Sequence, residues 1–359
     1  MKIGVYSPYL DSFGGGERYI LTIAEVLSKD HTVDLFYESH QQSLGIAGLK
    51  NTLEKRLNLD LSSVMLVKAP LGPDGNFSQR LLFFKKYDVL FYLTDGSVFY
   101  STARASIIHF QVPFPNKSAR SLWGKFKLSS WKEAVFNSYF TGDYVKKQWG
   151  VKGRVIYPPV DIGEIKPGPK HKYILSVGRF VSFTKAKKHE EMIKAFVQLY
   201  DLGKIPGWSL HLAGSVEGEE NYLEELKKIA GSTPVYFYPD LSFEKLMELY
   251  GKAAIYWHAA GLGENDPVKM EHFGITTVEA MAAGCVPVVI NKGGQKEIVE
   301  NKVSGLLWDD LEQLKNLTIE MVTKPDLRAK LAEAATLRSK QFSKERFAEN
   351  IRELVKKYG

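Results

Sequence analysis

Short hydrophobic runs alternate with longer, mostly polar segments along the chain, and the spacing of the hydrophobic positions differs between the two. The runs at 2–7, 32–37, 64–68 and 89–93 have the length of buried strands. Between the first two runs, hydrophobic residues recur at helical spacing from position 20 to 27. The opening therefore predicts a strand–helix–strand unit with three glycines, 14–16, in its first turn, as in nucleotide-binding doubly wound folds.

A second series of strands and helices begins at residue 173. Its expected strands are 173–177, 209–213, 235–238, 254–258, 286–290 and 305–308, and its expected helices are 189–202, 219–230, 242–251 and 275–283. Regular alternation of this kind predicts a mostly parallel α/β sheet covered by helices on both faces. Two such halves in tandem leave a cleft between them, onto which the carboxyl ends of the strands open.

The segment 158–172 is rich in proline and glycine, and it predicts a linker between the two halves. We therefore expect a first domain at 1–160 and a second at 161–342. The last residues, 343–359, have helical spacing, and such a tail can cross back onto the first domain of a two-lobed protein.

Length and composition narrow the class of protein. A chain of 359 residues is longer than a domain with a single hydrophobic core usually is. Its hydrophobic residues, 44% of the total, are enough to form two cores. The net charge of +7 favours an anionic ligand or membrane surface and does not by itself indicate nucleic acid. A single cysteine, Cys285, excludes an internal disulfide framework. No apolar run is long enough to span a membrane, and no signal peptide is recognised, so we expect a cytoplasmic protein.

The stretch 256–289 carries the most distinctive candidate chemistry. A polar loop, 259–274, leads into a helix that is expected to begin at Ile275, and a helix N-terminus suits a phosphate or diphosphate. Glu271 and Glu279 lie on either side of this N-terminus. Ribose or sugar hydroxyls would explain acids beside an anion site, but acids are also favoured in the first turns of any helix. Spacing alone leaves both interpretations open.

Basic residues follow the first strand of the second half. Arg179 comes two residues after that strand, and the lysines at 185, 187 and 188 precede the next helix. Arginine and lysine at a strand end, facing a helix N-terminus, can hold a diphosphate without a metal. The chain has no Asp-x-Asp motif and no cluster of residues at metal-ligand spacing. A solvated surface loop would explain the lysines equally well.

The first half offers two further candidates. His109 ends a predicted strand at the edge where open α/β sheets bind ligands. Two stretches, 79–87 and 117–132, interleave basic and aromatic residues, which is typical of a surface that binds anionic lipid. Ordinary amphipathic helices packed on a core produce the same mixture.

Several of these motifs also occur in a known family. They are VGRF at 177–180 with Lys187 downstream, LAG at 212–214, E-x7-E within EHFGITTVE at 271–279, GGGE at 14–17, the strand-end His109, FNSYFT at 136–141 and YPPVD at 157–161. Together they resemble the family 4 retaining glycosyltransferases, whose GT-B architecture consists of two Rossmann-like doubly wound domains facing a central cleft. The resemblance implies that the first domain, 1–160, binds the acceptor and that the second, 161–342, binds the nucleotide sugar. The resemblance is strongest to mannosyltransferases that extend lipid-linked oligosaccharides from GDP-mannose.

The resemblance implies roles for individual residues of the second half. Arg179 and Lys187 would hold the donor diphosphate, with Lys188 as the alternative because the loop 180–186 is longer than usual. Glu279 would bind the ribose, and Glu271 would lie at the donor sugar. The remaining donor-binding positions are backbone groups of Phe273, Gly274, Ile275 and Thr276.

In the first half, the resemblance places Gly15 and Gly16 near the diphosphate and His109 near the donor sugar and acceptor. Such enzymes need no metal to bind the donor, so neither a metal nor another cofactor is expected. An unusual insertion, 261–270, precedes Glu271, and its acids at 264 and 266 would either contact sugar or cap a surface loop.

The leading hypothesis is a retaining transferase that moves a hexose, mannose or glucose, from a GDP- or UDP-linked donor to a lipid-linked or other glycan. Its partners would be the donor, the acceptor and an anionic membrane surface, without nucleic acid. One alternative is an NAD-dependent oxidoreductase with tandem Rossmann domains, which the absence of G-x-G-x-x-G disfavours. Another is a non-catalytic protein that binds lipid or nucleic acid through 79–87 and 117–132.

Overall fold

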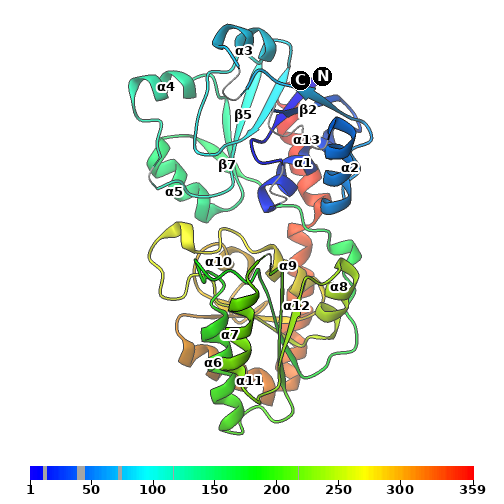
Figure 1. Ribbon diagram of the computed structural model, residues 1–359, viewed down its shortest axis with the longest axis vertical. Coiled ribbons are helices and arrows are strands. Elements are labelled where there is room, and N and C mark those ends of the chain that lie inside the picture. The colour runs from blue at the N-terminus through cyan, green and yellow to red at the C-terminus, as the bar shows by residue number, and fades with distance from the viewer. Residues whose placement is uncertain (11–13, 39–44, 72–74, 116, 217) are drawn as a thin grey trace. The chain divides into compact units, whose positions relative to one another are not determined.

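The computed structural model describes residues 1–10, 14–38, 45–71, 75–115, 117–216 and 218–359 (Figure 1). These form two compact units. Unit 1 comprises Met1–Pro159 together with Lys344–Gly359, and unit 2 comprises Val160–Ser343. The C-terminal helix therefore belongs to unit 1, together with the N-terminal residues.

Unit 1 is built on a seven-stranded parallel sheet with the strand order β3-β2-β1-β4-β5-β6-β7. Its strands are β1 (Lys2–Tyr6), β2 (Thr32–Tyr37), β3 (Val64–Lys68), β4 (Val89–Leu93), β5 (Ala105–Phe110), β6 (Glu133–Phe136) and β7 (Gly153–Val155). Alternate side chains of β4 enter two different cores: Phe91 and Leu93 lie in one, and Leu90 and Tyr92 in the other. The sheet is therefore covered on both faces, which is why its strands are hydrophobic throughout.

The helices of unit 1 are α1 (Gly15–Leu27), α2 (Gly45–Leu57), α3 (Phe77–Phe84), α4 (Leu122–Leu128), α5 (Tyr139–Trp149) and α13 (Lys344–Lys356). The last helix packs on the first. The rings of Tyr19 and Phe347 meet edge to face at 4.9 Å, and Lys344 forms an ion pair of 2.8 Å with Glu25. These contacts hold the chain terminus in the core of unit 1.

Unit 2 has a six-stranded parallel sheet with the order β10-β9-β8-β11-β12-β13. Its strands are β8 (Tyr173–Val177), β9 (Ser209–Gly214), β10 (Val235–Pro239), β11 (Ile255–His258), β12 (Val286–Ile290) and β13 (Leu306–Trp308). Its helices are α6 (His189–Asp201), α7 (Glu220–Ala230), α8 (Phe243–Lys252), α9 (Ile275–Ala282), α10 (Gln295–Ile298), α11 (Leu311–Thr323) and α12 (Pro325–Ser339), with short 3-10 turns at Ile162–Glu164, Pro267–Lys269 and Lys340–Phe342. In both sheets the order reverses beside the first strand, which in such folds opens a binding crevice.

The segment expected to be a linker is largely part of unit 2. Val160 and Ile165 are buried, and the ammonium of Lys170 donates hydrogen bonds to the carbonyls of Gly251 (2.9 Å) and Ala283 (2.5 Å). Those carbonyls belong to the C-terminal ends of α8 and α9, where a cation is favourable. Proline and glycine content alone could not reveal this anchoring lysine.

The two basic-aromatic stretches divide between core and surface. Phe84, Tyr87 and Trp131 are buried in the aromatic core of unit 1, as the core interpretation expects. In contrast, α4 buries none of its residues, and the side chains of Trp123 and Phe126 are about half exposed. Among the described residues, no helix is long and apolar enough to cross a membrane.

Candidate functional site

Several elements of unit 2 bring polar groups to the carboxyl edge of its sheet. β8 ends at Val177 and is followed by Gly178 and Arg179, while the neighbouring β11 ends at His258. Because parallel strands end at the same edge, loops distant in sequence meet there. Helix α9 starts at this edge, with Gly274 as its N-cap.

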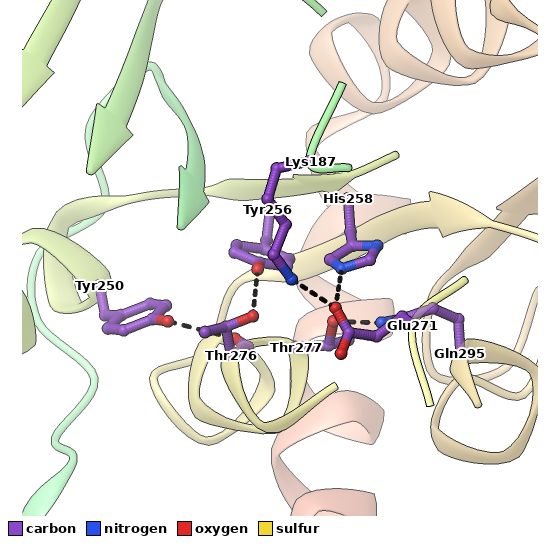
Figure 2. A network of polar contacts seen from close by, with 8 residues as sticks. All are labelled: Lys187, Tyr250, Tyr256, His258, Glu271, Thr276, Thr277 and Gln295. Carbon is purple, nitrogen blue, oxygen red and sulfur yellow. Dashed lines mark hydrogen bonds and ion pairs between the residues drawn. The ribbon is translucent and has the colours of Figure 1, made fainter. Parts of the chain in front are cut away.

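Glu271 is the centre of a charged network at this edge (Figure 2). Its Oε2 lies 2.6 Å from the ammonium of Lys187 and 3.0 Å from Nε2 of His258. Burial by itself would raise the pKa of Glu271, but the charge of Lys187 and the hydrogen bond from His258 outweigh it and hold that pKa well below its usual value. The carboxylate is thus ionised and held in a fixed orientation.

His258 is buried, with 2% of its surface exposed. Burial lowers its pKa, so the ring is neutral near pH 7 and donates from Nε2 to Glu271. Its Nδ1 is then an acceptor, and it has no hydrogen-bond partner in the described part of the chain. Sequence reasoning missed this histidine. The available signal was a titratable residue at the last position of a buried strand.

Two tyrosines fix the N-terminus of α9. Tyr256 donates a hydrogen bond of 2.8 Å to the hydroxyl of Thr276, and Tyr250 approaches the carbonyl of Thr276 at 3.3 Å (Figure 2). Tyr250 also donates a bond of 2.9 Å to Glu279, whose exposed fraction is 9%. Glu279 is therefore held from α8, and it is not merely an acid on a solvated first turn.

A glycine-rich turn after β12 supports the same loop from behind. The amide of Gly294 donates to the carbonyl of Glu271 at 2.8 Å, and a Cβ added to Gly293 would lie 2.2 Å from that carbonyl oxygen. Gly274 has φ +120, and a Cβ there would lie 2.3 Å from Nε2 of Gln295. Gln295 in turn accepts a 2.9 Å hydrogen bond from Thr277 in α9. Only glycine allows these backbones to pass so closely.

The two adjacent lysines have different partners. Lys187 contacts Glu271, whereas Lys188 contacts Glu264 at 2.7 Å in the insertion 261–270. Lys292 also donates to the backbone carbonyl of Glu264 at 2.8 Å. Asp266 caps the short turn that follows, accepting a hydrogen bond from the amide of Val268. The insertion is therefore tied down beside the network by lysines from two separate loops.

Arg179 differs from these lysines. Its side chain is exposed at the end of β8, and its guanidinium has no hydrogen bond or ion pair among the described residues. A Cβ added to Gly214 would lie 2.0 Å from the carbonyl oxygen of Gly178, so the adjacent strand ends can pack this tightly only because Gly214 lacks a side chain.

The candidates of unit 1 have other surroundings. Gly15 begins α1 and is exposed, whereas a Cβ on Gly16 would lie 3.1 Å from Leu93. His109 is 1% exposed, and its ring stacks on Tyr19 with centroids 3.8 Å apart. Its Nε2 contacts the amide oxygen of Gln111 at 2.8 Å, and burial lowers its pKa to about 4. This histidine is neutral and packed into the core.

Within the described residues, no three histidine, cysteine, aspartate or glutamate side chains gather closely enough to hold a metal ion. Cys285 is buried, and burial raises the pKa of its thiol to about 11. A buried thiol with a raised pKa is not an activated nucleophile.

Known proteins resemble this chain in sequence over half of its length or somewhat more. Residues 161–338 match the family model described as "Glycosyl transferases group 1". A GDP-Man:Man(3)GlcNAc(2)-PP-Dol alpha-1,2-mannosyltransferase of Dictyostelium discoideum is 26% identical over 250 residues, 63% of this chain and 47% of that protein. The mouse alpha-1,3/1,6-mannosyltransferase ALG2 is 26% identical over 62% of this chain and 58% of its own length. The chain thus spans about half the length of the relatives it matches.

Solved structures resemble it over nearly its whole length. A glycosyltransferase from Rickettsia africae superposes with a TM-score of 0.73 at 18% identity, covering 99% of this chain and 98% of that one. Anabaena HepE in complex with UDP and glucose gives a TM-score of 0.71 at 19% identity, covering 99% and 100%. At these identities the likeness concerns the fold. Together with the two parallel α/β units, it confirms the expected GT-B fold.

Proposed function

We propose that this chain, whose residues 161–338 form a glycosyl transferase group 1 domain on a GT-B fold, transfers a hexose from a nucleotide sugar to a glycan acceptor with retention of configuration. The observation that carries this proposal is the network of Lys187, His258 and Glu271 beside the N-terminus of α9. This network provides an ionised acid next to an anion site, which is the combination that a sugar diphosphate requires.

The donor diphosphate would bind between Arg179 and the first amides of α9. No acid of the described chain neutralises Arg179, so it offers its full charge to a ligand. The ammonium of Lys187 already lies within the network, where it contacts Glu271. When the donor binds, this ammonium would contact a phosphate oxygen in place of the carboxylate. The donor would then bind through these groups without a metal ion.

Glu279, held by Tyr250, would accept hydrogen bonds from the ribose, and Glu271 would accept from hydroxyls of the donor sugar. His258 orients Glu271, because its Nε2–H fixes one carboxylate oxygen. No side chain of the network is placed as an evident nucleophile. Retention would follow if the acceptor hydroxyl attacks the face from which the diphosphate leaves, with a departing phosphate oxygen taking the proton. The protein would contribute positioning and charge stabilisation.

Names of similar proteins guide the choice of donor and acceptor. The Dictyostelium relative acts, by its name, with GDP-mannose on a dolichol-linked glycan, and HepE was crystallised with UDP and glucose. We therefore favour mannose or glucose on GDP or UDP, and an acceptor linked to a lipid.

We also propose that α3 and α4 contact an anionic membrane from its cytoplasmic side. Leu122 and Trp123 of α4 are 89% and 57% exposed, and Leu82 of α3 is 67% exposed. Lys125 and Lys127 lie on the same short helix as the exposed apolar residues. Apolar side chains combined with lysines are suited to the boundary between headgroups and acyl chains.

Release of nucleotide from GDP-mannose, GDP-glucose, UDP-mannose and UDP-glucose, measured with and without acceptor, tests the enzymatic proposal. We expect Arg179→Ala and Glu271→Ala each to lower turnover by about 100-fold or more, because each removes a group that acts at the transition state. Lys187→Gln should reduce donor binding more than Lys188→Gln, whose partner is Glu264.

Far-ultraviolet circular dichroism of each variant checks that the fold survives. Full activity of folded Arg179→Ala or Glu271→Ala would refute the assignment of the site. Thermal stabilisation by NAD and by none of the four nucleotide sugars would instead favour the oxidoreductase alternative.

A further inference from the structure

Unit 1 contains a cavity of about 590 Å3 that none of the roles discussed so far uses. It lies where two strands begin: Glu133 is the first residue of β6, and Lys152 directly precedes β7. Leu128 and Trp149, the last residues of α4 and α5, also line it. We call it the α4–α5 cavity. It is therefore at the amino edge of these strands, away from the carboxyl ends at which doubly wound folds bind their substrates.

The charges that line the α4–α5 cavity are mostly positive. They belong to Arg120, Lys125, Lys132 and Lys152, against the single acid Glu133. The three lysines are exposed, and their ammonium groups have no hydrogen bond or ion pair among the described residues. Nothing in the described part of the chain therefore neutralises these three charges.

Arg120 and Glu133 are already satisfied within the protein. Nε of Arg120 donates to the carbonyl of Gln148 at 2.9 Å, near the C-terminal end of α5, where a cation is favourable. The carboxylate of Glu133 pairs with Arg154 at 2.7 Å and with Lys357 at 3.0 Å. Because the fold uses this arginine and this acid, the lysines set the charge that a ligand would meet.

The buried wall of the cavity contains a donor without an acceptor. Trp149 is 4% exposed, and its ring packs edge to face on Phe110 with centroids 5.1 Å apart. Its Nε1 is buried and has no hydrogen-bond partner among the residues that the structure describes. A buried N–H group is unfavourable unless an acceptor reaches it. Solvated lysines need no ligand, but this indole of the same cavity needs an acceptor that the fold does not supply.

The remainder of the lining includes apolar side chains, those of Ile108, Leu128 and Val151. An apolar wall combined with cations that lack partners suits an anion that carries an apolar part. A phosphate group has several oxygens, so it can accept from ammonium groups and from an indole N–H at the same time. The volume of the cavity lies within the usual range for small-molecule sites.

We propose that the α4–α5 cavity binds a soluble phosphate ester whose organic part is apolar or aromatic. A phosphate oxygen would accept from Nε1 of Trp149, and the three lysines would neutralise the phosphate. The organic part would pack on Ile108, Leu128 and Val151. This site is separate from the strand carboxyl edges of both units, so its occupation does not depend on the proposed transferase function.

Three soluble probes separate the parts of this proposal: 1-naphthyl phosphate, 1-naphthol without the phosphate, and inorganic phosphate. Each is titrated calorimetrically into the full chain at low salt. We expect 1-naphthyl phosphate to bind more tightly than either part alone. Lys152→Gln should weaken 1-naphthyl phosphate about fivefold or more and leave 1-naphthol within about twofold, because only the phosphate contacts the lysine.

Lys147→Gln is the matched control, because Lys147 is an exposed lysine of α5 whose ammonium has no partner among the described residues and which does not line the cavity. It should bind all three probes like the wild type. Equal weakening of 1-naphthyl phosphate by both variants would show a diffuse attraction and overturn the site. Failure of the wild type to bind 1-naphthyl phosphate would overturn it as well. Thermal unfolding of each variant distinguishes a lost contact from a lost fold.

The indole resonance tests the buried donor directly. In protein with isotope-labelled tryptophan, the Nε1–H resonance of Trp149 is the one missing from Trp149→Phe. Inorganic phosphate, which has no ring to disturb the resonance, should move it to lower field, because the N–H becomes hydrogen-bonded. A resonance that stays in place while the phosphate probes bind would refute the contact with Trp149.

Vesicles separate a soluble ligand from a lipid headgroup, since Lys125 lies on α4. Saturating 1-naphthyl phosphate should leave sedimentation of the protein with anionic vesicles unchanged. If the probe instead displaces the vesicles, the cavity holds a lipid headgroup and the soluble ligand is refuted.

Discussion

Units 1 and 2 have the same kind of parallel sheet, yet the polar groups at their strand ends are satisfied differently. In unit 2, lysines meet acids: Lys187 pairs with Glu271 and Lys188 with Glu264. In unit 1, Glu38 accepts from the phenol of Tyr6, and Nε of Arg80 has no partner among the described residues. One architecture can therefore prepare two kinds of ligand contact.

In unit 2, the lysine–acid pairs keep both charges in place before a ligand arrives. An unpaired buried acid would become protonated, and an unpaired lysine would take up many orientations. In unit 1, neutral phenols hold the carboxylate, so the cation remains available for an anion. The exposed Arg179 of unit 2 is available to an anion in the same way, because its guanidinium has no hydrogen bond or ion pair among the described residues.

Buried histidines also distinguish the two units. In unit 2, burial lowers the pKa of four histidines, His189, His211, His258 and His272. Among the described residues of unit 1, burial lowers the pKa of one histidine, His109. Each is neutral in the folded protein. Unit 2 therefore has more groups that favour unfolding when the solution becomes acidic.

The largest effect should come from breaking the glycine turn behind Glu271. Gly293 and Gly203 have similar left-handed conformations, with φ +59 and +64, but a Cβ meets the carbonyl oxygen of Glu271 at 2.2 Å in the first case and nothing within 4 Å in the second. Gly203→Ala should cost about 1–2 kcal/mol from conformation alone. Gly293→Ala should cost at least about 2 kcal/mol more, because backbone must also move.

Urea unfolding of both variants measures this difference, and nucleotide binding should weaken in Gly293→Ala only. Equal free energies of unfolding for the two variants would show that the turn at Gly293 accommodates a Cβ without moving the backbone of Glu271.

A change of pH should destabilise unit 2 more than unit 1. For His189 and His211, burial lowers the pKa to about 3 and about 4, below the ordinary value of 6.5. Their contribution to stability is present above pH 6.5 and is lost as the pH falls toward these values, because the unfolded chain binds the protons first. Between pH 7 and 5 we expect a loss of roughly 1–2 kcal/mol for each such group. Glu271, whose pKa is also lowered, adds to the loss only below about 4.5.

Hydrogen exchange followed by mass spectrometry, corrected for the intrinsic pH dependence, measures the two units within one chain. His189→Gln should reduce the pH dependence of unit 2 specifically. Parallel loss of protection in both units would contradict the difference in their histidines.

The smallest effect concerns membrane binding, and two leucines provide a matched pair. Leu122 of α4 and Leu202 at the end of α6 are 89% and 69% exposed. Leu122→Ala should reduce sedimentation with vesicles of anionic lipid about threefold or more, since it removes methylenes that would enter the interface. Leu202→Ala should have no effect. If both variants pellet like the wild type, or if the wild type does not pellet at low salt, the membrane surface is not on α4.

Hydrophobic spacing predicts the order and type of most elements. Strands β2, β3, β4, β8 and β12 have the bounds that their hydrophobic runs predict, and the doubly wound fold follows from the alternation. The sequence also identified Glu271, Glu279 and Arg179 as belonging to one edge of one sheet, because strand ends and a helix start can be read locally. Helices α2, α10 and α11 and strand β6 were missed, since short or evenly mixed patterns give no clear period. Helices α3 and α4 were expected only as the alternative explanation of the two basic-aromatic stretches.

Which side chains meet depends on the tertiary structure. Lys187 and Glu271 lie 84 residues apart, and the sequence predicted no pairing between them. It offered Lys187 for the donor diphosphate, with Lys188 as the alternative. The contact of His258 with Glu271 and the capping of two helices by Lys170 do not follow from hydrophobic spacing. The physical reason is that periodicity reports which face of an element is buried. The pairing of charges depends on strand order and on loop paths, which hydrophobic spacing does not encode.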